Sequence, residues 1–405
     1  MKPIVRAGRM KPVHSDIRGP LFVEAMKRQK QGIDILKLNT GNPATFGFGL
    51  PDSIKNALME HMQDGVGYCD FKGMPQARQA ICDYETSKGI NGITSDDVFI
   101  GNGVSEVVSF ALTPLLNDGD EVLVPSPSYS LWGNSVYLED GKPVFYTCDE
   151  QANWYPDIQD IRSKITDKTK AIVIINPNNP TGVLYPKELL LEIIQIARES
   201  GLLIFADEIY DRLVMDGKQH ISLASLTEDV PVITLNGLSK SHCLCGYRCG
   251  WMVISGPREL TEDYRQGIIQ LTSLRLCANT MAQIVIPAAL DDMDTPASMV
   301  RPGGRIYEQR EATVRELEKI NGLSFVKNDA AFYVFPKLDV KKFNITNDKQ
   351  FAHDLLDATN ILLVPGSGFD WKDPDHFRIV MLPQADILSD AIRRMGTFLD
   401  GYKQK

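Results

Sequence analysis

One short segment near the middle of the chain, NGLSKSHCLCGYRCGW at residues 236–251, combines side chains that could do several kinds of chemistry. Lys240 offers an amine, and burial or a nearby cation would lower its pKa and make it a usable nucleophile. Arg248 could be that cation, or it could clamp an anion. The cysteines of the segment could instead bind a metal. The segment alone leaves open a covalent anchor, a metal site and a plain buried turn.

The metal alternative depends on three cysteines, Cys243, Cys245 and Cys249, which are spaced C-x-C-x3-C. This is not a usual structural zinc pattern, and no companion Cys/His pair lies nearby in the sequence. We therefore expect no metal and predict that the thiols pack as small apolar side chains. Zinc in stoichiometric amount in the purified protein would contradict this.

Polar clusters also follow four other apolar, β-branched runs: GNGVSE, PSPSY, PNNPTG and DEIY each come directly after such a run, as GLSK does. Open α/β sheets bind ligands at the carboxyl ends of their strands. The sequence therefore predicts one site assembled from five strand ends. The predicted strands are DVFI (97–100), EVLV (121–124), AIVIIN (171–176), LLIFA (202–206) and PVITLN (231–236).

Each of these clusters holds a side chain with a functional and a structural interpretation. Asp207 could pair with a buried cation such as a pyridinium nitrogen, or cap a helix. Tyr210 could point to the same place. Asn179 could place an amide beside an oxygen ligand, or belong to a plain loop. Ser105 and the backbone N–H groups at a helix start could hold a phosphate, and Tyr129 could stack on a flat ring or lie in the core.

The pattern of alternating strands and helices predicts an α/β fold with a large domain, in which helices sandwich a mostly parallel sheet, and a smaller α+β domain. PKELLLEIIQIARESG (186–201) has apolar residues at helical spacing, and GGRIYEQREATVRELEKI (303–320) is typical of a polar helix that could connect the domains. We expect an N-terminal arm with part of the small domain at 1–48, the large domain at 49–294 and the small domain at 295–405. The small domain contains predicted strands at 332–336, 361–365 and 377–382 and a loop at 366–376.

Composition excludes several classes of partner. The net charge is -9, with 43% apolar and 23% charged residues, which argues against a nucleic-acid or an anionic membrane surface as the main partner. The basic N-terminus, MKPIVRAGRMKPVHSD, is followed by no apolar run typical of a signal peptide. The seven cysteines follow no secreted-type framework. We therefore expect a cytoplasmic protein.

The motifs GLSK-x7-R-x-GW, NPNNPTG and DEIY together form an ordered set that resembles the fold-type I pyridoxal-phosphate aminotransferases of the aspartate-aminotransferase superfamily. The resemblance extends from LNTGNP at 38–43 to FRIVMLP at 377–383. Within that superfamily, NGLSKSHCLCGYRCGW and TSLRLCANTMAQ are most similar to bacterial alanine (glutamate–pyruvate) aminotransferases. The resemblance implies a pyridoxal 5'-phosphate cofactor, amino acid and 2-oxo acid substrates, ping-pong transamination between alanine and 2-oxoglutarate, and a homodimer with active sites at the subunit interface.

The resemblance also implies a role for residues around the cofactor ring. Lys240 would be the covalent anchor of the cofactor and would move a proton between the substrate Cα and the cofactor. Asp207 would keep the pyridine nitrogen protonated. Tyr210 and Asn179 would bind the 3-oxygen of the ring, and Tyr129 would stack on the ring.

The phosphate and the substrate would be held by other residues. The phosphate would be bound by Val104 and Ser105 at a helix start, by Ser239, by Arg248 and by Tyr68 of the neighbouring subunit. Arg378 would pair with the substrate α-carboxylate through a bidentate fork, and the backbone of Gly41, with Asn179, would approach the substrate closely.

One position departs from the family pattern, and three alternatives stay open. Many relatives have a hydroxyl residue three before the lysine, where this chain has Gly237, so the phosphate would depend more on the other residues of its cup.

Arg275 is a candidate for the distal carboxylate of glutamate, or a surface arginine. The alternatives are a transaminase of aromatic or branched-chain amino acids, a lyase on the same fold, and a cofactor-sensing regulator, which would need a DNA-binding module that the first 40 residues are too short to form.

Overall fold

The computed structural model describes residues 2–405, and its largest element is an eight-stranded sheet. Neighbouring strands from β8 through β7, β6 and β3 to β4 are parallel, whereas β9 runs antiparallel to both of its neighbours and β5 is an antiparallel edge strand. The predicted mostly parallel sheet is therefore confirmed. In spatial order the strands are β2 (Val98–Asn102), β9 (Cys249–Ser255), β8 (Val232–Gly237), β7 (Leu203–Asp207), β6 (Thr169–Ile175), β3 (Glu121–Ser126), β4 (Lys142–Asp149) and β5 (Tyr155–Pro156).

Helices cover both faces of this sheet. Successive side chains of a strand point to opposite faces, so each strand can contribute apolar side chains to both layers of helices. In β3, Val122 and Val124 pack on the face covered by α4, α5 and α9, while Leu123 packs with α6 and α7 on the other. Both faces are therefore buried, which explains the continuous apolar runs in the sequence. These helices are α4 (Val104–Leu112), α5 (Leu131–Leu138), α6 (Ile158–Lys164), α7 (Lys187–Ser200) and α9 (Arg258–Arg275).

The predicted helix at 186–201 is confirmed as α7, with its ends where the sequence signals place them. Pro186 occupies the position before the first helical residue, and Gly201 ends the helix with a φ of 65°, a left-handed conformation that glycine adopts without steric cost. The sheet unit also contains α2 (Asp52–His61), α3 (Pro75–Ser87), α8 (Leu238–Ser241), α10 (Thr280–Ile284), α11 (Ile286–Asp291) and α12 (Asp294–Val300).

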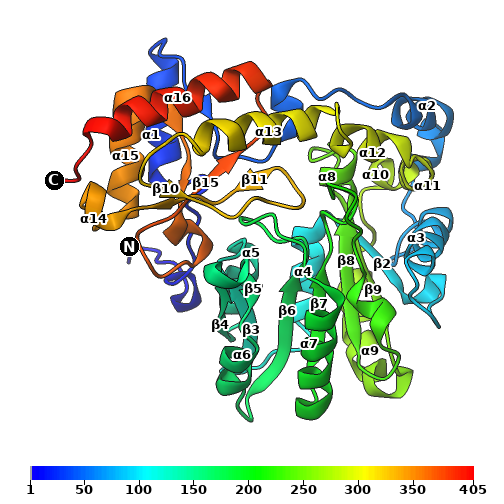
Figure 1. Cartoon of the computed structure of the whole chain (residues 1–405). Coiled ribbons are helices and arrows are strands. Elements are labelled where there is room, and N and C mark those ends of the chain that lie inside the picture. The colour runs from blue at the N-terminus through cyan, green and yellow to red at the C-terminus, as the bar shows by residue number, and fades with distance from the viewer. Residues whose placement is uncertain (1) are drawn as a thin grey trace.

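A second unit of short strands and helices lies at the end of the large sheet where β8 runs into α8 (Figure 1). Its strands form one three-stranded and two two-stranded sheets. The N-terminal part of the chain joins this unit, because β1 pairs in parallel with β13. The elements are β1 (Leu36–Lys37), β10 (Leu323–Ser324), β11 (Tyr333–Val334), β12 (Lys337–Leu338), β13 (Ile361–Leu362), β14 (Val364–Pro365), β15 (Phe377–Val380), α1 (Pro20–Lys30), α13 (Arg305–Leu317), α14 (Val340–Phe343), α15 (Asp348–Thr359) and α16 (Ala385–Gly401).

The predicted domain boundaries at 48/49 and 294/295 stay predictions, because packing is continuous across the second of them. Met299 and Ile306 share one apolar cluster with Tyr210 and Leu213. The predicted polar helix at 303–320 is present as α13, but it is more buried than its charge suggests. Arg310, for example, is fully buried and forms a two-pronged ion pair with Asp216.

Several predicted elements of the sequence differ in the structure. The predicted strands at 332–336 and 361–365 are shorter, and the second is divided into β13 and β14. The predicted loop at 366–376 begins with a 3-10 turn, Gly366–Phe369. Strands β4 and β9 were not predicted. β9 begins inside the segment at 236–251, for which we predicted no strand after Asn236. Its apolar residues, WMVI, follow two glycines, which are more typical of a loop.

No single helix among residues 2–405 has both the length and the apolar composition to cross a membrane. One bent pair, α9 with Thr280–Asp291, meets those two criteria together, with an angle of 118° between its parts.

Candidate functional site

The carboxyl ends of β7 and β8 bring the two most reactive predicted side chains to the same edge of the sheet. Asp207 is the last residue of β7, and Lys240 lies in α8, directly after β8. The Lys240 Nζ donates a hydrogen bond of 2.9 Å to the carbonyl of Gly41. A residue of the N-terminal segment therefore contacts a residue about 200 positions later, as expected for a site assembled from distant segments.

Opposing effects act on the pKa of Lys240. Burial lowers the pKa of the ammonium, neighbouring phenol and thiol groups raise it, the Arg378 guanidinium lowers it, and the net direction is upward. The expected lowering of this pKa is therefore wrong, and the cation that acts on the lysine is Arg378 rather than Arg248. A raised pKa favours the protonated ammonium, and the amine must lose that proton before it can act as a nucleophile.

Asp207 is a buried carboxylate without a positively charged partner. Only 5% of the residue is exposed, and no basic side chain within residues 2–405 lies within 4.0 Å of it. The Trp132 Nε1 donates a hydrogen bond of 3.0 Å to one oxygen, and the Ile209 N–H lies 3.4 Å from the other. Burial raises the pKa of Asp207 to about 6, although both donors oppose this shift. A cationic ligand placed beside this carboxylate would stabilise its charged form.

Asp207 should make the stability of the cofactor-free protein depend on pH. Its folded-state pKa of about 6 lies above the ordinary value of 3.8, so the folded state binds the proton more tightly than the unfolded state. The free energy of unfolding should therefore rise as the pH falls from about 6 to 4, by on the order of 3 kcal/mol from this group alone. Asp207→Asn should lose this contribution. Urea unfolding of both proteins between pH 4.5 and 7 checks it, and parallel pH profiles would contradict the assignment.

The loop at 176–182 is buried along its whole length, so its polar groups need partners inside the protein. The Asn176 side chain accepts a hydrogen bond of 2.9 Å from the Tyr185 N–H, and the Asn178 amide donates one of 3.1 Å to the Pro127 carbonyl. These two asparagines therefore hold the loop. The third, Asn179, directs its side-chain oxygen to a guanidinium nitrogen of Arg378 at 3.0 Å, which places it in the predicted site.

Arg378 is a buried cation without a carboxylate partner. It lies on β15, is 1% exposed, and has no carboxylate within 4.0 Å among residues 2–405. One nitrogen donates to Asn179 and another to the backbone carbonyl of Asn39. Its guanidinium carbon lies 4.6 Å from the ring centre of Tyr333 and 4.7 Å from that of Phe369. Burial lowers the pKa of Arg378, and nearby phenols oppose this. A buried, unpaired cation is costly, so an anionic ligand would stabilise it.

The start of α4 forms a cradle that faces Arg248. The first N–H groups of a helix have no carbonyl partner within the helix, and here they belong to Val104 and Ser105. Gly103, which precedes them, has a φ of 85°, and a Cβ added there would lie 2.3 Å from an Arg248 nitrogen. A Cβ at Gly250 would lie 2.4 Å from the Val104 nitrogen. Gly103 thus allows the Arg248 guanidinium to approach the start of α4, and Gly250 allows β9 to do so. This arrangement could bind an anion.

The glycine that replaces the family's hydroxyl residue has a packing reason. Gly237 ends β8, where it pairs with Gly250 of β9. A Cβ at Gly237 would lie 2.5 Å from the Cys249 carbonyl oxygen, so β9 leaves no room for a side chain at this position. Gly250 therefore allows β9 to approach both α4 and β8.

Other predicted residues are placed less directly. Tyr129 follows β3 and affects the pKa of both Lys240 and Arg378. Ser239 is half-buried beside Lys240, and its carbonyl accepts a hydrogen bond. Tyr68 is 83% exposed and contributes nothing to the site of its own chain.

The structure places Arg275, the candidate for a distal substrate carboxylate, in a network of its own chain. Its guanidinium donates to Glu106 and to the carbonyls of Phe71, at 3.2 Å, and Ile100, at 3.1 Å. The guanidinium also lies over the ring of Phe110, 5.2 Å from its centre. These contacts favour the structural interpretation of Arg275.

Sequence reasoning missed four residues that contact the site: Asn39, Trp132, Tyr333 and Phe369. Trp132 lies three residues after Tyr129 of the PSPSY cluster, which was a usable signal. Tyr333 and Phe369 lie in segments that we interpreted only as a strand and a loop. Nothing in the sequence indicates that the Tyr333 hydroxyl lies 2.8 Å from that of Tyr210.

The three thiols of the central segment have separate environments. Cys249 is buried in an apolar cluster, Cys243 lies 3.9 Å from the Met299 sulfur, and Cys245 donates to the Ser239 carbonyl at 3.0 Å. Among residues 2–405, two other groups of side chains have the geometry to hold a metal ion, and neither contains a cysteine. In the buried group, the Lys88 ammonium lies 2.8 Å from Glu208 and already supplies a positive charge.

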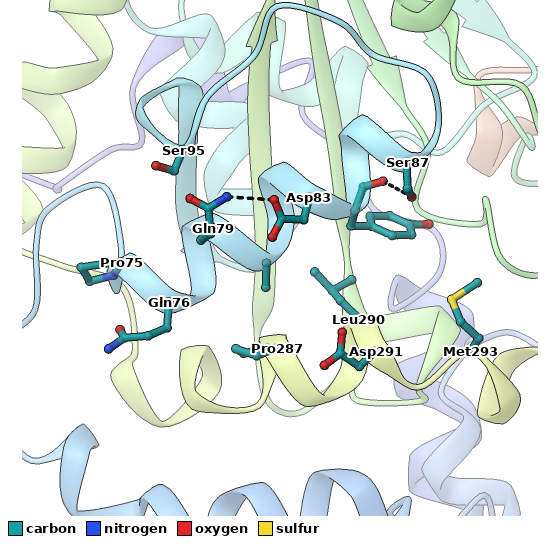
Figure 2. Close-up of a pocket in the computed structure, with 12 residues that line it drawn as sticks. Pro75, Gln76, Gln79, Asp83, Ser87, Ser95, Pro287, Leu290, Asp291 and Met293 are labelled. Atoms are coloured by element: carbon teal, nitrogen blue, oxygen red, sulfur yellow. Dashed lines mark hydrogen bonds between the residues drawn. The ribbon is translucent and has the colours of Figure 1, made fainter.

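An open groove of about 810 Å³ lies elsewhere, between α3 and α11 (Figure 2). Gln76, Gln79 and Asp83 line it from α3, and Pro287 and Leu290 line it from α11. None of its lining residues is among those predicted to do chemistry. The candidate site is instead the edge of the large sheet, where a lysine, an unpaired carboxylate and an unpaired guanidinium lie near an anion cradle.

Several known proteins are similar to this chain over its whole length or nearly so. Glutamate-pyruvate aminotransferase AlaA of Haemophilus influenzae is 50% identical over 404 residues, which cover 100% of both chains. Among solved structures, an aminotransferase from Escherichia coli is 47% identical with a TM-score of 0.98 and 100% coverage of both chains. Alanine aminotransferase from Pyrococcus furiosus is 41% identical with a TM-score of 0.92, covering 98% of this chain and 100% of that one. The family described as aminotransferase class I and II matches residues 33–392, and the chain belongs to this family.

Proposed function

We propose that the chain is a pyridoxal-phosphate-dependent alanine transaminase that converts L-alanine and 2-oxoglutarate to pyruvate and L-glutamate. Class I and II aminotransferases depend on pyridoxal phosphate in general, and relatives that are 45–50% identical over this whole chain carry the names glutamate-pyruvate aminotransferase or alanine aminotransferase. The observation that carries the proposal is the pair of buried charges, Asp207 and Arg378, in a site that also contains Lys240. Neither of the two has an oppositely charged side chain within 4.0 Å among residues 2–405.

The residues around the α4 start fit the phosphate of this cofactor. A Cβ at Gly103 would lie 2.3 Å from an Arg248 nitrogen, so the glycine lets this guanidinium lie against the start of α4. The N–H groups of Val104 and Ser105, the Ser105 hydroxyl and the Arg248 guanidinium would bind the phosphate oxygens. Ser239, which is half-buried beside the anchor lysine, would complete the cup.

The residues at the ends of β6 and β7 fit the ring. When bound, pyridoxal phosphate supplies an electron sink for the bond that breaks at the substrate Cα. The Asp207 carboxylate would hold the proton on the pyridine nitrogen, which would also resolve the cost of its unpaired burial. Tyr210 and Asn179 would bind the 3-oxygen of the ring, and Tyr129 would stack on its face.

Lys240 would have two tasks. Its amine would hold the cofactor covalently between turnovers, and the two half-reactions would follow a ping-pong order. Once the substrate amine has displaced it, the Lys240 Nζ would move a proton between the substrate Cα and the cofactor C4′. The hydrogen bond from Nζ to the Gly41 carbonyl supports a position for this amine close to the backbone that would line the substrate.

Arg378 would bind the substrate α-carboxylate. It is a fixed, desolvated guanidinium that is held between two aromatic rings and oriented by Asn179. A carboxylate would remove the penalty of its unpaired charge, and a bidentate fork would fix the substrate orientation. This requirement applies to both the amino acid and the 2-oxo acid, so one arginine serves both halves of the reaction.

We also propose a homodimer with active sites at the subunit interface. Large apolar side chains are exposed at Val66 and Tyr68, and at Leu274 and Leu276 near the end of α9. Such exposure is typical of a surface that a partner covers. Tyr68 would then reach the cofactor phosphate of the partner subunit. A monomer of 45.1 kDa in light scattering at micromolar concentration would contradict this proposal.

A panel of amino donors tests the function most directly. Purified protein with added pyridoxal phosphate is assayed with L-alanine, L-aspartate, L-tyrosine, L-phenylalanine and L-leucine against 2-oxoglutarate. We expect kcat/KM for alanine to exceed the others by at least about 10-fold, a difference of about 1.4 kcal/mol in barrier. Slow alanine turnover beside rapid aromatic or branched-chain turnover would reject the substrate assignment. Release of ammonia without transfer to 2-oxoglutarate would indicate a lyase.

A further inference from the structure

The hydroxyl of Tyr333 lies where three distant segments meet. Tyr333 is on β11 and is 2% exposed. Its hydroxyl oxygen is 2.8 Å from that of Tyr210, and a Cβ at Gly41 would lie only 2.2 Å from it. The hydroxyl is therefore packed against the backbone of Gly41, a proposed substrate-binding residue, and is hydrogen-bonded to Tyr210, a proposed cofactor-binding residue. The sequence alone indicated no role for Tyr333.

The ring of Tyr333 is fixed by its neighbours, so its hydroxyl has a defined position. Tyr333 pairs with Val380 in the antiparallel β11–β15 ladder. Arg378 is two residues from Val380, so it lies on the same face of the sheet, and its guanidinium carbon is 4.6 Å from the Tyr333 ring centre. The rings of Phe332 and Tyr210 pack at 4.8 and 5.7 Å. Cation and aromatic contacts thus hold the ring on several sides.

The direction of the hydrogen bond between the two phenols follows from counting protons. Each phenol has one proton, so a hydroxyl that donates to one partner can only accept from another. Burial and the neighbouring Tyr333 raise the pKa of Tyr210 well above its ordinary value, so Tyr210 remains a phenol. Either hydroxyl of this pair can be the donor, and the proposed function selects one arrangement, because Tyr210 must keep its single proton for the 3-oxygen of the cofactor ring. Tyr210 then accepts, and its own proton is free for a ligand.

We propose that Tyr333 is a positioning residue of the transamination site, which donates its proton to the Tyr210 oxygen and so directs the Tyr210 proton to the 3-oxygen of the cofactor ring. This inference rests on the proposed function. Hydrogen bonds in such a chain strengthen one another, so loss of the first weakens the second. The Tyr210 donor and a proton on the lysine–cofactor link compete to stabilise the same ring oxygen. A weaker donor therefore raises the pH at which the link loses its proton.

The test is a visible-absorbance pH titration of the holoenzyme. Tyr333→Phe keeps the ring that Arg378 contacts and removes only the hydroxyl. We expect its titration midpoint to rise by about 0.5 to 1 pH unit, the effect of losing part of one hydrogen bond. In a Tyr210→Phe background the same substitution should add less than about 0.2 unit, because the two residues act as one chain.

Tyr146→Phe is the matched control. Tyr146 is also fully buried, and its hydroxyl donates 2.7 Å to the Val173 carbonyl, but it lies inside the sheet core. The Tyr146→Phe variant should lower the stability of the protein and leave the titration midpoint unchanged. This control separates the positioning effect of Tyr333 from the general loss of a buried hydrogen bond.

Two results would overturn the inference while leaving the proposed function intact: a Tyr333→Phe midpoint equal to wild type, or shifts from Tyr333→Phe and Tyr210→Phe that add fully in the double variant. A wild-type protein that develops no visible cofactor band would overturn the proposed function, and this inference with it.

Discussion

We expect Lys240→Ala to bind pyridoxal phosphate but to lower the rate of transamination by about 10⁴-fold or more. The substitution removes the covalent anchor and also the group that moves the proton at the substrate Cα, and general acid–base catalysis alone contributes up to about 10⁴-fold. Among residues 2–405, Lys240 is the lysine whose Nζ donates to the Gly41 carbonyl. Stopped-flow absorbance and a coupled pyruvate assay measure both effects.

Lys164→Ala is the control for the loss of a lysine that makes polar contacts. Lys164 donates to the Phe145 carbonyl and to Asp160, each at 2.7 Å, on the opposite part of the sheet unit. It should retain wild-type turnover and the wild-type cofactor spectrum. Full activity of Lys240→Ala would end the proposed mechanism.

Arg378→Lys should lower kcat/KM for both alanine and 2-oxoglutarate by about 100-fold. Lysine keeps the positive charge but cannot form the planar fork that binds a carboxylate with two hydrogen bonds, and disrupting a buried charged pair costs about 2 kcal/mol or more. The Arg378→Lys variant also loses the contacts of the guanidinium with Asn179 and with the rings of Tyr333 and Phe369. The steady-state constants for each substrate measure this, and most of the change should appear in KM.

Arg310→Lys separates this effect from the general cost of losing a buried arginine. Arg310 is as buried as Arg378 and also forms a fork, but its partner is Asp216 of the same chain. We expect Arg310→Lys to lower the thermal stability and to leave KM for both substrates within about 2-fold of wild type. Equal KM changes in the two variants would contradict a specific role of Arg378 in carboxylate binding.

The sequence predicted those parts of the site that depend on local patterns. Asp207 and Asn179 could be placed because each follows an apolar strand, and the carboxyl ends of parallel strands meet at one edge. Asn179 also shows the limit of this reasoning. The sequence did not distinguish it from Asn176 and Asn178, whose hydrogen bonds hold the loop, since that distinction requires the positions of Tyr185 and Pro127.

Long-range packing explains the residues that could not be predicted. Tyr333 reaches Tyr210 and Gly41 only because β11 lies over the carboxyl end of the large sheet, and no periodicity in the sequence carries that information. The upward pKa of Lys240 likewise depends on side chains from several segments. Strand β9 was missed because an antiparallel strand interrupts an otherwise parallel pattern, and the glycines before it suggested a turn.

The central claim is that Lys240 carries the cofactor, and borohydride trapping tests it most directly. Holoenzyme is reduced with sodium borohydride, digested, and mapped by mass spectrometry. The account predicts one phosphopyridoxyl modification, on Lys240 in the peptide that contains the segment at 236–251, and none after prior incubation with excess L-alanine, because the substrate displaces the lysine. Modification of a different lysine, or a wild-type protein that binds cofactor without any reducible link, would contradict it.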